Sequence, residues 1–210
     1  ELKTPLTTIY GVSDMMAEGI VKPADVKGFG KDIKDESGRM ISLIDDIIKL
    51  SKLDEDYVPE EISDVDLFQV SKSVIDRLKD IAEDKNISIY LEGERAEIKG
   101  IPTLCDEIIY NLCENAVKYN KENGSVTVSV KNTKEGVELS VEDTGVGIPF
   151  EYRERIFERF FRVDKSHCQI VNGTGLGLSM VKHAVLHLGG SIDLESVEGA
   201  GTKMIIKFPH

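Results

Sequence analysis

Asn111-Leu112-Cys113-Glu114-Asn115-Ala116-Val117-Lys118-Tyr119 lies in a segment that begins at Pro102. The segment predicts a helix over residues 102–119, because proline is favoured in the first turn of a helix. Asn111 and Asn115 are four residues apart and share one helix face, with Lys118 one turn further along. Amide oxygens suit a hard cation, and an ammonium group suits phosphate. The face is either a ligand site or an ordinary polar surface.

Two glycine-rich segments follow along the chain. Asp143-Thr144-Gly145-Val146-Gly147-Ile148, the first glycine segment, comes directly after an apolar strand. An acidic residue there can accept a hydrogen bond from an amine such as that of adenine, although such a segment can also be a tight turn. Gly173-Thr174-Gly175-Leu176-Gly177-Leu178, the second glycine segment, opens a predicted helix whose N-terminal amides suit phosphate. Its spacing matches neither the Rossmann fingerprint nor the P-loop.

A long, mostly loop-like region between residues 145 and 173 separates these segments, and it contains Phe157-Glu158-Arg159-Phe160-Phe161-Arg162. A loop of this length inside a compact domain is usually functional. Its arginines can place a guanidinium on a phosphoryl group. Alternatively, the phenylalanines simply hold a hydrophobic loop against the core.

The N-terminal part of the chain has a helical pattern. Apolar residues mark one face of a short first helix: Leu2, Leu6, Ile9 and Met16. Residues 19–22 supply a turn, and residues 23–54 form a long helix whose seam positions alternate in steps of four and three: Ile33, Ser37, Met40, Ile44, Ile47 and Ser51. The two helices predict an antiparallel hairpin. Because so thin a hairpin cannot bury both helical faces alone, we expect a homodimer that forms a four-helix bundle.

The two helices of this hairpin differ in length. The second, with about 32 residues, spans roughly 48 Å, whereas the first, with about 18 residues, spans roughly 27 Å. Ile44, Ile47 and Leu50 lie in the half of the second helix that the first does not reach. We therefore expect these three residues to have no partner in this chain, and we expect upstream residues to complete the first helix.

Helices and strands alternate after an acidic segment at residues 57–66, which we interpret as a linker. The expected helices cover residues 67–84, 102–119 and a segment ending near residue 188, and the expected strands cover residues 87–92, 125–132, 137–143, 191–196 and 202–208. This mixture predicts a two-layer α/β sandwich. The chain is thus expected to be of the α+β class, with a hairpin over residues 1–56 and a sandwich over residues 67–210.

Charge and cysteine content argue against several classes of function. The 210 residues carry 38 acidic and 26 basic side chains, and the net charge of −12 argues against binding to nucleic acid or to an anionic membrane surface. No apolar run is long enough to span a bilayer. Cys105, Cys113 and Cys168 form no metal-binding pair, so we expect them to be small apolar residues in a reducing compartment.

The order and spacing of these segments resemble the sensor histidine kinases of two-component signalling. The matching motifs are the histidine box without its first residue (Glu1-Leu2-Lys3-Thr4-Pro5-Leu6), the N box (residues 111–119), the first glycine box (143–148), the phenylalanine box (157–162), the second glycine box (173–178) and a final glycine turn (Gly199-Ala200-Gly201-Thr202). The resemblance covers essentially the whole chain. It implies a dimerisation and phosphotransfer hairpin followed by a catalytic ATP-binding domain of the GHKL, or Bergerat, type.

The resemblance also implies the ligands of that domain, ATP and Mg²⁺. Asn115 would hold the Mg²⁺ with the help of Asn111, and Asp143 would accept a hydrogen bond from the adenine amine. Lys118, Tyr119 and Arg162 would lie near the phosphates. The remaining residues implied to bind ATP are Gly145, Gly147, Ile148, Gly173, Thr174, Gly175, Leu176, Gly177 and Thr202, of which residues 173–177 would belong to a mobile ATP lid.

In the hairpin, the resemblance implies a phosphoacceptor histidine immediately before Glu1, with Glu1 as the base that prepares its imidazole. Thr4 would orient a water that attacks the phosphorylated response regulator. The receiver domain of that regulator would contact the exposed face of the first helix around Thr8, Gly11, Val12 and Met15, although these four can also be plain bundle surface.

Two alternatives remain open. A GHKL ATPase or serine kinase would carry a glutamate four residues before the metal-binding asparagine, but that position holds Asn111, whose amide cannot take a proton. A nucleotide-binding signalling module without catalysis would fit if the residue before Glu1 were not histidine. We expect these residues to be cytoplasmic and free of direct membrane contact, with the whole protein anchored in a membrane by upstream segments.

Overall fold

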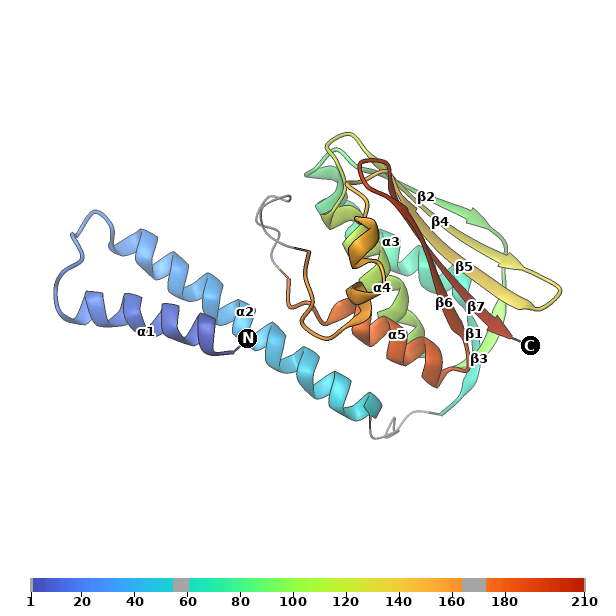
Figure 1. The fold of residues 1–210 in the computed structure, drawn as a ribbon, viewed down its shortest axis with the longest axis horizontal. Coiled ribbons are helices and arrows are strands. Elements are labelled where there is room, and N and C mark those ends of the chain that lie inside the picture. The colour runs from blue at the N-terminus through green and yellow to red at the C-terminus, as the bar shows by residue number, and fades with distance from the viewer. Residues whose placement is uncertain (1, 55–60, 164–172, 210) are drawn as a thin grey trace.

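The computed structural model describes residues 2–54, 61–163 and 173–209, which form a helical hairpin followed by an α/β sandwich (Figure 1). This architecture confirms the expected α+β class. Among the helices of these three stretches, none combines the length and the apolar character that crossing a membrane requires.

The hairpin consists of α1 (Lys3–Ala17) and α2 (Val26–Asp54), which lie antiparallel. Helix α1 ends where Gly19 adopts a φ of +69° and the amide of Ile20 donates to the carbonyl of Met15 at 3.1 Å. Glycine is favoured in this left-handed cap because it has no side chain. With 29 residues against 15, α2 extends well past α1.

The sandwich is built on a five-stranded sheet whose strands lie in the order β2-β4-β5-β7-β6. The strands are β2 (Ser88–Gly93), β4 (Ser125–Asn132), β5 (Gly136–Asp143), β6 (Ser191–Val197) and β7 (Gly201–Pro209). Strand β2 runs parallel to β4, and every other neighbouring pair is antiparallel. The sheet therefore sets β5 beside the C-terminal strand β7.

Three helices cover one face of this sheet: α3 (Leu67–Glu83), α4 (Pro102–Lys118) and α5 (Gly177–His187). Strand residues two positions apart turn toward them, and Val126 and Val128 are completely buried. Asp66 caps the N-terminus of α3, where its carboxylate accepts a hydrogen bond from the amide of Phe68 at 3.0 Å. The helices and the sheet share one continuous apolar core.

A small second sheet pairs β1 (Ser63–Asp66) with β3 (Glu97–Gly100) and was not predicted. Strand β1 lies at the end of the segment that we interpreted as a linker, so that interpretation is wrong for residues 63–66. The strand is too short and too polar to show a clear alternation, and only Val65 is buried in it. The expected loop also contains two short 3₁₀ helices, η1 (Phe150–Tyr152) and η2 (Arg155–Phe157).

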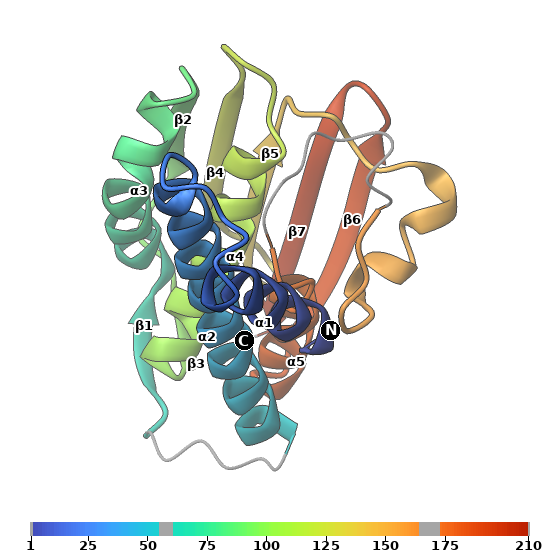
Figure 2. The same ribbon diagram turned by 90° about the vertical axis from the view of Figure 1, so that its left-hand side faces the viewer.

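Helix α2 packs against the sandwich as well as against α1, and in Figure 2 it lies in front of the helical layer. Leu43 and Leu50 are buried, and together with Ile47 they form an apolar cluster with Leu176 and Met180. The expectation that Ile47 and Leu50 have no partner in this chain is therefore wrong. Their partners lie more than one hundred residues away in the sequence, where the helical pattern of α2 alone does not reveal them.

Cys105 and Cys113 are buried on α4 and form no disulfide. Burial raises the pKa of each thiol to about 12, so both stay protonated and unreactive at neutral pH. These two cysteines thus behave as small apolar core residues, as expected. Cys168 lies outside the described residues.

The turn that joins β4 to β5 offers a test of the fold. Gly136 has a φ of +144°, and a Cβ there would lie 1.9 Å from the carbonyl oxygen of Phe208. We expect Gly136→Ala to lower the free energy of unfolding by about 2–4 kcal/mol, because it adds a backbone clash to a strained φ. Gly189 has a φ of +74° with no atom within 4 Å of its missing Cβ. Gly189→Ala should lower the free energy of unfolding by only about 1 kcal/mol. If urea unfolding gives the same loss for both variants, the close pairing of β5 with β7 is contradicted.

Candidate functional site

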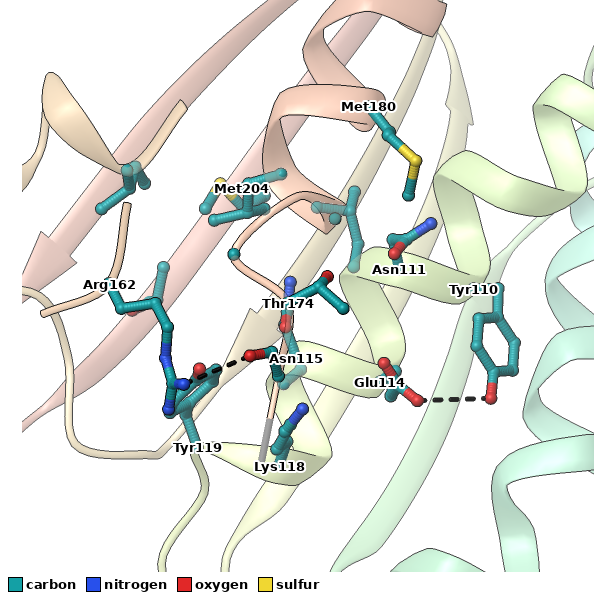
Figure 3. A pocket seen from close by; sticks show the side chains of 18 of the residues that line it. Tyr110, Asn111, Glu114, Asn115, Lys118, Tyr119, Arg162, Thr174, Met180 and Met204 are labelled. Carbon is teal, nitrogen blue, oxygen red and sulfur yellow. Dashed lines mark hydrogen bonds between the residues drawn. The ribbon is translucent and has the colours of Figure 1, made fainter. Parts of the chain in front are cut away.

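A cavity of about 1350 Å³ lies where α4, the ends of β5 and β7, both glycine segments and α2 meet. Figure 3 shows part of it, with Asn111, Asn115 and Lys118 of α4 beside Thr174 of the second glycine segment. Cavities that bind small molecules usually measure about 300–1,000 Å³. The larger volume here reflects the cleft that continues along α2.

Helix α4 forms the polar wall of the cavity. Its apolar residues are buried against the sheet: Leu104, Ile108, Ile109, Leu112, Ala116 and Val117. Asn111, Asn115 and Lys118 lie on the other face and line the cavity. The side-chain amide of Asn111 donates to the carbonyl of Glu107 at 2.8 Å, which leaves the Asn111 oxygen free to act as an acceptor.

The ends of β5 and β7 form a second wall. Asp143 pairs with Thr202 and Val141 pairs with Met204 in the β5–β7 register. Because residues two positions apart share a face of a strand, all four side chains point to the same side, and all four line the cavity. The carboxylate of Asp143 accepts a hydrogen bond from the amide of Gly145 at 2.7 Å. A polar acceptor thus lies beside an apolar surface that can cover a flat ring.

The first glycine segment is held by hydrogen bonds to its neighbours. The amide of Val146 donates to the carbonyl of Tyr119, at the end of α4, at 3.1 Å. The amide of Ile148 donates to the hydroxyl of Ser196 at 2.8 Å. Gly147 has a φ of +67°, and a Cβ there would lie 2.0 Å from the carbonyl oxygen of Val197. Only glycine fits this approach.

The second glycine segment lies close to α4 because its glycines lack side chains. A Cβ on Gly173 would lie 3.0 Å from Nζ of Lys118, and one on Gly177 would lie 2.7 Å from Oδ1 of Asn111. Gly177 is also the first residue of α5, so free amides of the N-terminal turn of that helix lie beside the polar wall. Such amides carry a partial positive charge and suit an anion.

Cations gather at this end of the cavity, although the chain has a net charge of −12. Nη1 of Arg162 donates to the carbonyl of Gly173 at 3.2 Å. Burial lowers the pKa of Lys118, and the neighbouring cations of Arg162, Lys85 and Arg39 lower it further, whereas Glu114 opposes them. Because like charges crowded in a partly buried site repel one another, a bound anion would stabilise this cluster.

Asp143 is the most perturbed carboxylate among the described residues. Burial raises its pKa to about 6, and the negative charge of Glu142 adds to the shift. Hydrogen bonds from the backbone of Gly145 and Thr202 oppose the shift by stabilising the charged form. The carboxylate is therefore ionised at neutral pH and can accept a hydrogen bond from a ligand.

The structure brings most of the predicted ATP-binding residues together around the cavity: Asn111, Asn115, Lys118, Tyr119, Asp143, Gly147, Ile148, Arg162, Gly173, Thr174, Gly175, Gly177 and Thr202. Gly145 and Leu176 are not among the lining residues. Gly145 acts through its hydrogen bond to Asp143, and Leu176 is completely buried against α2.

The predicted residues of the hairpin lie apart from the cavity. Thr4, Thr8 and Met15 are exposed on α1, and Gly11 and Val12 are partly buried there. No described residue of α1 lines the cavity. Glu1 lies outside the described residues.

Sequence reasoning missed three contributions to the site. Val141 and Met204 could have been found from the strand period, because each is two residues from a predicted site residue. Ser196 is buried, accepts from the first glycine segment and lies 2.9 Å from Oγ1 of Thr202, but an isolated serine in a strand carries no signal. The residues of α2 that line the cavity, such as Asp46, were assigned only to the hairpin.

Two protein families match the chain. The family described as histidine kinase-, DNA gyrase B- and HSP90-like ATPase matches residues 100–210. The phosphoacceptor domain of His kinase A matches residues 1–56. The first match covers the cavity walls that α4, β5, β7 and both glycine segments form, and the second covers the hairpin, including the residues of α2 that line the cavity.

Individual relatives are sensor kinases. The chain is 34% identical to the sensor-like histidine kinase SenX3 of Mycolicibacterium smegmatis and to the sensor histidine kinase WalK of Bacillus subtilis, over its full length in both cases. It covers 55% of the former and 35% of the latter, so it spans about half or less of these relatives.

Solved structures of histidine kinases share the fold. The Acinetobacter baumannii histidine kinase AdeS superposes with a TM-score of 0.81 at 22% identity, covering all of this chain and 96% of that one. The mycobacterial sensor histidine kinase MprB has 28% identity and a TM-score of 0.62 over 70% of this chain and 97% of its own. Histidine kinase ThkA, solved in complex with the response regulator protein TrrA, has a TM-score of 0.76 at 24% identity over all of this chain and 58% of that one.

The raised pKa of Asp143 predicts a pH-dependent effect of Asp143→Asn on stability. A carboxyl group whose pKa rises on folding stabilises the folded state at low pH, and this contribution is lost as the pH rises through about 6. We therefore expect the variant to be more stable than the wild type at pH 7.5, by about 1–3 kcal/mol, and this advantage to shrink as the pH falls toward about 4.

Urea unfolding at several pH values measures this difference. The matched control is Glu135→Gln, which neutralises an exposed carboxylate on the β4–β5 turn and should give no such trend. If the difference in free energy of unfolding between Asp143→Asn and the wild type does not change with pH, the raised pKa of Asp143 is contradicted.

Proposed function

Because the chain belongs to the family of histidine kinase-, DNA gyrase B- and HSP90-like ATPases, we propose that it is the catalytic core of a two-component sensor histidine kinase. In this proposal it transfers the γ-phosphoryl group of ATP to a histidine that precedes Glu1. The observation that carries the proposal is the convergence of Asn115, Lys118, Asp143 and the second glycine segment on one cavity.

Each wall of the cavity has a role in binding ATP. Asp143 accepts a hydrogen bond from the adenine amine, and Val141 and Met204 cover the ring. The amides of the second glycine segment bind the phosphates, and Lys118 and Arg162 neutralise their charge. Phosphoryl transfer depends mostly on such positioning and charge neutralisation, so these residues would help to orient the γ-phosphate for in-line attack.

Mg²⁺ fits this donor set when it is shared with the nucleotide. The described residues hold no group of three or more carboxylates, histidines or cysteines that could form a closed metal cage. Asn115 and Asn111 offer neutral oxygens beside the phosphate position, and Mg²⁺ commonly combines few protein oxygens with phosphate oxygens and water. Bound there, it would neutralise charge on the phosphates during transfer.

The hairpin supplies the acceptor and the partner surface. Glu1 prepares the imidazole of the preceding histidine, and the phosphoryl group then passes to an aspartate of a response regulator that contacts α1 around Thr8, Gly11, Val12 and Met15. The complex of ThkA with a response regulator supports such a partner. Because α1 does not reach the cavity, transfer to the histidine requires the sandwich to move relative to the hairpin or a second protomer to supply the acceptor.

A homodimer is consistent with the surface of the hairpin. Several large apolar side chains are exposed on α1 and α2, among them Leu6 at 54%, Tyr10 at 72%, Ile41 at 62% and Ile48 at 48%. Packing two hairpins into a four-helix bundle would bury such residues. The two alternatives are less well supported, because Asn111 cannot act as the base of an ATPase and the hairpin provides a phosphoacceptor domain.

Labelling with γ-labelled ATP tests the proposal. We expect the whole protein, incubated with Mg²⁺, to acquire phosphate that is labile in acid and stable in alkali, and to lose this labelling when the residue before Glu1 is changed. Bound nucleotide without labelled protein would favour a module without catalysis. Free phosphate without labelled protein would favour an ATPase.

Asn115→Ala tests the metal assignment. If Asn115 holds Mg²⁺, nucleotide affinity should become insensitive to added Mg²⁺, and phosphoryl transfer should fall by about 100-fold or more. Nucleotide titration with and without Mg²⁺ measures this dependence. Asn132→Ala, at the exposed end of β4, should behave as the wild type. An unchanged Mg²⁺ dependence in Asn115→Ala would remove Asn115 from the site.

Thr4→Ala tests the reverse reaction. If Thr4 orients the attacking water, the variant should dephosphorylate its response regulator about 10-fold more slowly while autophosphorylation stays near the wild-type rate. Thr7→Ala is the matched control, because Thr7 is also exposed on α1. If Thr4→Ala slows both reactions equally, damage to the helix would explain the result instead.

A further inference from the structure

Helix α2 contacts the second glycine segment directly. The hydroxyl of Thr174 donates to Oδ2 of Asp46 at 2.8 Å and accepts from the amide of Leu176 at 3.3 Å. A hydroxyl has a single proton to donate. While Thr174 donates to Asp46, it cannot donate to a phosphate oxygen.

Two further contacts hold α2 in this position. Nζ of Lys49 lies 2.9 Å from Oε1 of Glu107 on α4, which is an ion pair between the hairpin and the sandwich. The apolar cluster of α2 packs on Leu176 and Met180, which are 0% and 3% exposed. The Asp46 carboxylate is therefore held against the glycine segment by the packing of its helix.

The position of Asp46 conflicts with the binding of phosphates. Asp46 lines the same cavity as Lys118, Arg162 and the amides at the start of α5. These groups suit an anion, and the carboxylate of Asp46, which is hydrogen-bonded to Thr174, is already such an anion. A phosphate brought to the same groups would be repelled by Asp46 in a partly buried site, where charges are weakly screened.

We propose that Asp46 occupies part of the phosphate position, so that the packing of α2 on the second glycine segment and the binding of ATP exclude one another. This inference rests on the proposed function, because it takes the cavity as the ATP site. ATP carries one more phosphate than ADP, so the charge of Asp46 opposes the binding of ATP more strongly than that of ADP. Asp46 is thus a residue of the hairpin that determines how the site discriminates between the two nucleotides.

The exclusion acts in both directions. If docked α2 lowers the affinity for ATP, then bound ATP must weaken the docking of α2 by the same factor, because the two equilibria are linked. ATP would thereby free the sandwich from the hairpin, and such release is one of the two routes by which the histidine that precedes Glu1 could be reached. The nucleotide itself would start the domain movement.

Nucleotide titrations of Asp46→Asn test the charge conflict. The matched control is Asp45→Asn, which removes the same charge from the neighbouring, exposed position of α2. We expect Asp46→Asn to raise the affinity for Mg·ATP by about 3–10-fold and that for Mg·ADP by less, whereas Asp45→Asn changes either by less than about 2-fold. An ATP affinity in Asp46→Asn that equals that of Asp45→Asn, or falls below the wild type, would overturn the proposal. A wild type that binds no ATP would instead refute the proposed function.

Oxidation of Met180 tests whether the hydrogen bond from Thr174 to Asp46 helps to hold α2 on the second glycine segment. Met180 is buried under the apolar residues of α2, whereas Met15 is 38% exposed on α1 and serves as an internal reference. With dilute hydrogen peroxide and no nucleotide, we expect Met180 to oxidise several-fold faster in Asp46→Ala than in Asp45→Ala, relative to Met15. Mass spectrometry of the peptides measures both rates. Equal relative rates in the two variants would show that Asp46 does not hold α2 in place, and would overturn the proposal that phosphates weaken the docking of α2 by competing with Asp46.

Discussion

Helix α4 must bury one face on the sheet and leave the other face polar, and the site depends on this division. The buried residues of α4, such as Ile108 and Leu112, anchor it across the sheet and fix its rotation. With that rotation fixed, Asn111, Asn115 and Lys118 can only point into the cavity. The glycine segments then approach this polar face from two sides, because their glycines leave room for it.

The second wall follows from the pairing of β5 with β7. This register places Asp143 opposite Thr202, although 59 positions separate them in the sequence. Burial at the end of the sheet raises the pKa of Asp143, but hydrogen bonds from two backbone amides keep the carboxylate ionised at neutral pH. The cavity therefore has an acceptor at one end and a cluster of cations at the other, which matches the base and the phosphates of a nucleotide.

The sequence was sufficient for those features that depend on local pattern. The period of α4, the alternation of β4 and β5 and the spacing of the glycines predicted the sandwich. Most of the residues that the resemblance implied to bind ATP line the cavity, and the family matches confirm the resemblance. The second sheet was missed because β1 is short and polar. The role of α2 was missed because Leu50 and Asp46 acquire their partners only through folding, from residues on α5 and the second glycine segment.

Helix α2 consequently belongs to both parts of the molecule. Its first half packs along α1, and its second half covers the cavity and bonds to Thr174. In the proposed kinase, the helix that would carry the dimer interface also lines the nucleotide cavity, so nucleotide binding can be coupled to the position of the catalytic domain.

A crystal structure with Mg²⁺ and a non-hydrolysable ATP analogue would show whether this cavity is a nucleotide site. We expect the adenine amine within hydrogen-bond distance of Asp143, the metal on the oxygen of Asn115 and the phosphates beside Lys118 and the second glycine segment. An analogue bound outside the cavity, or a cavity that stays empty at saturating analogue, would refute the assignment.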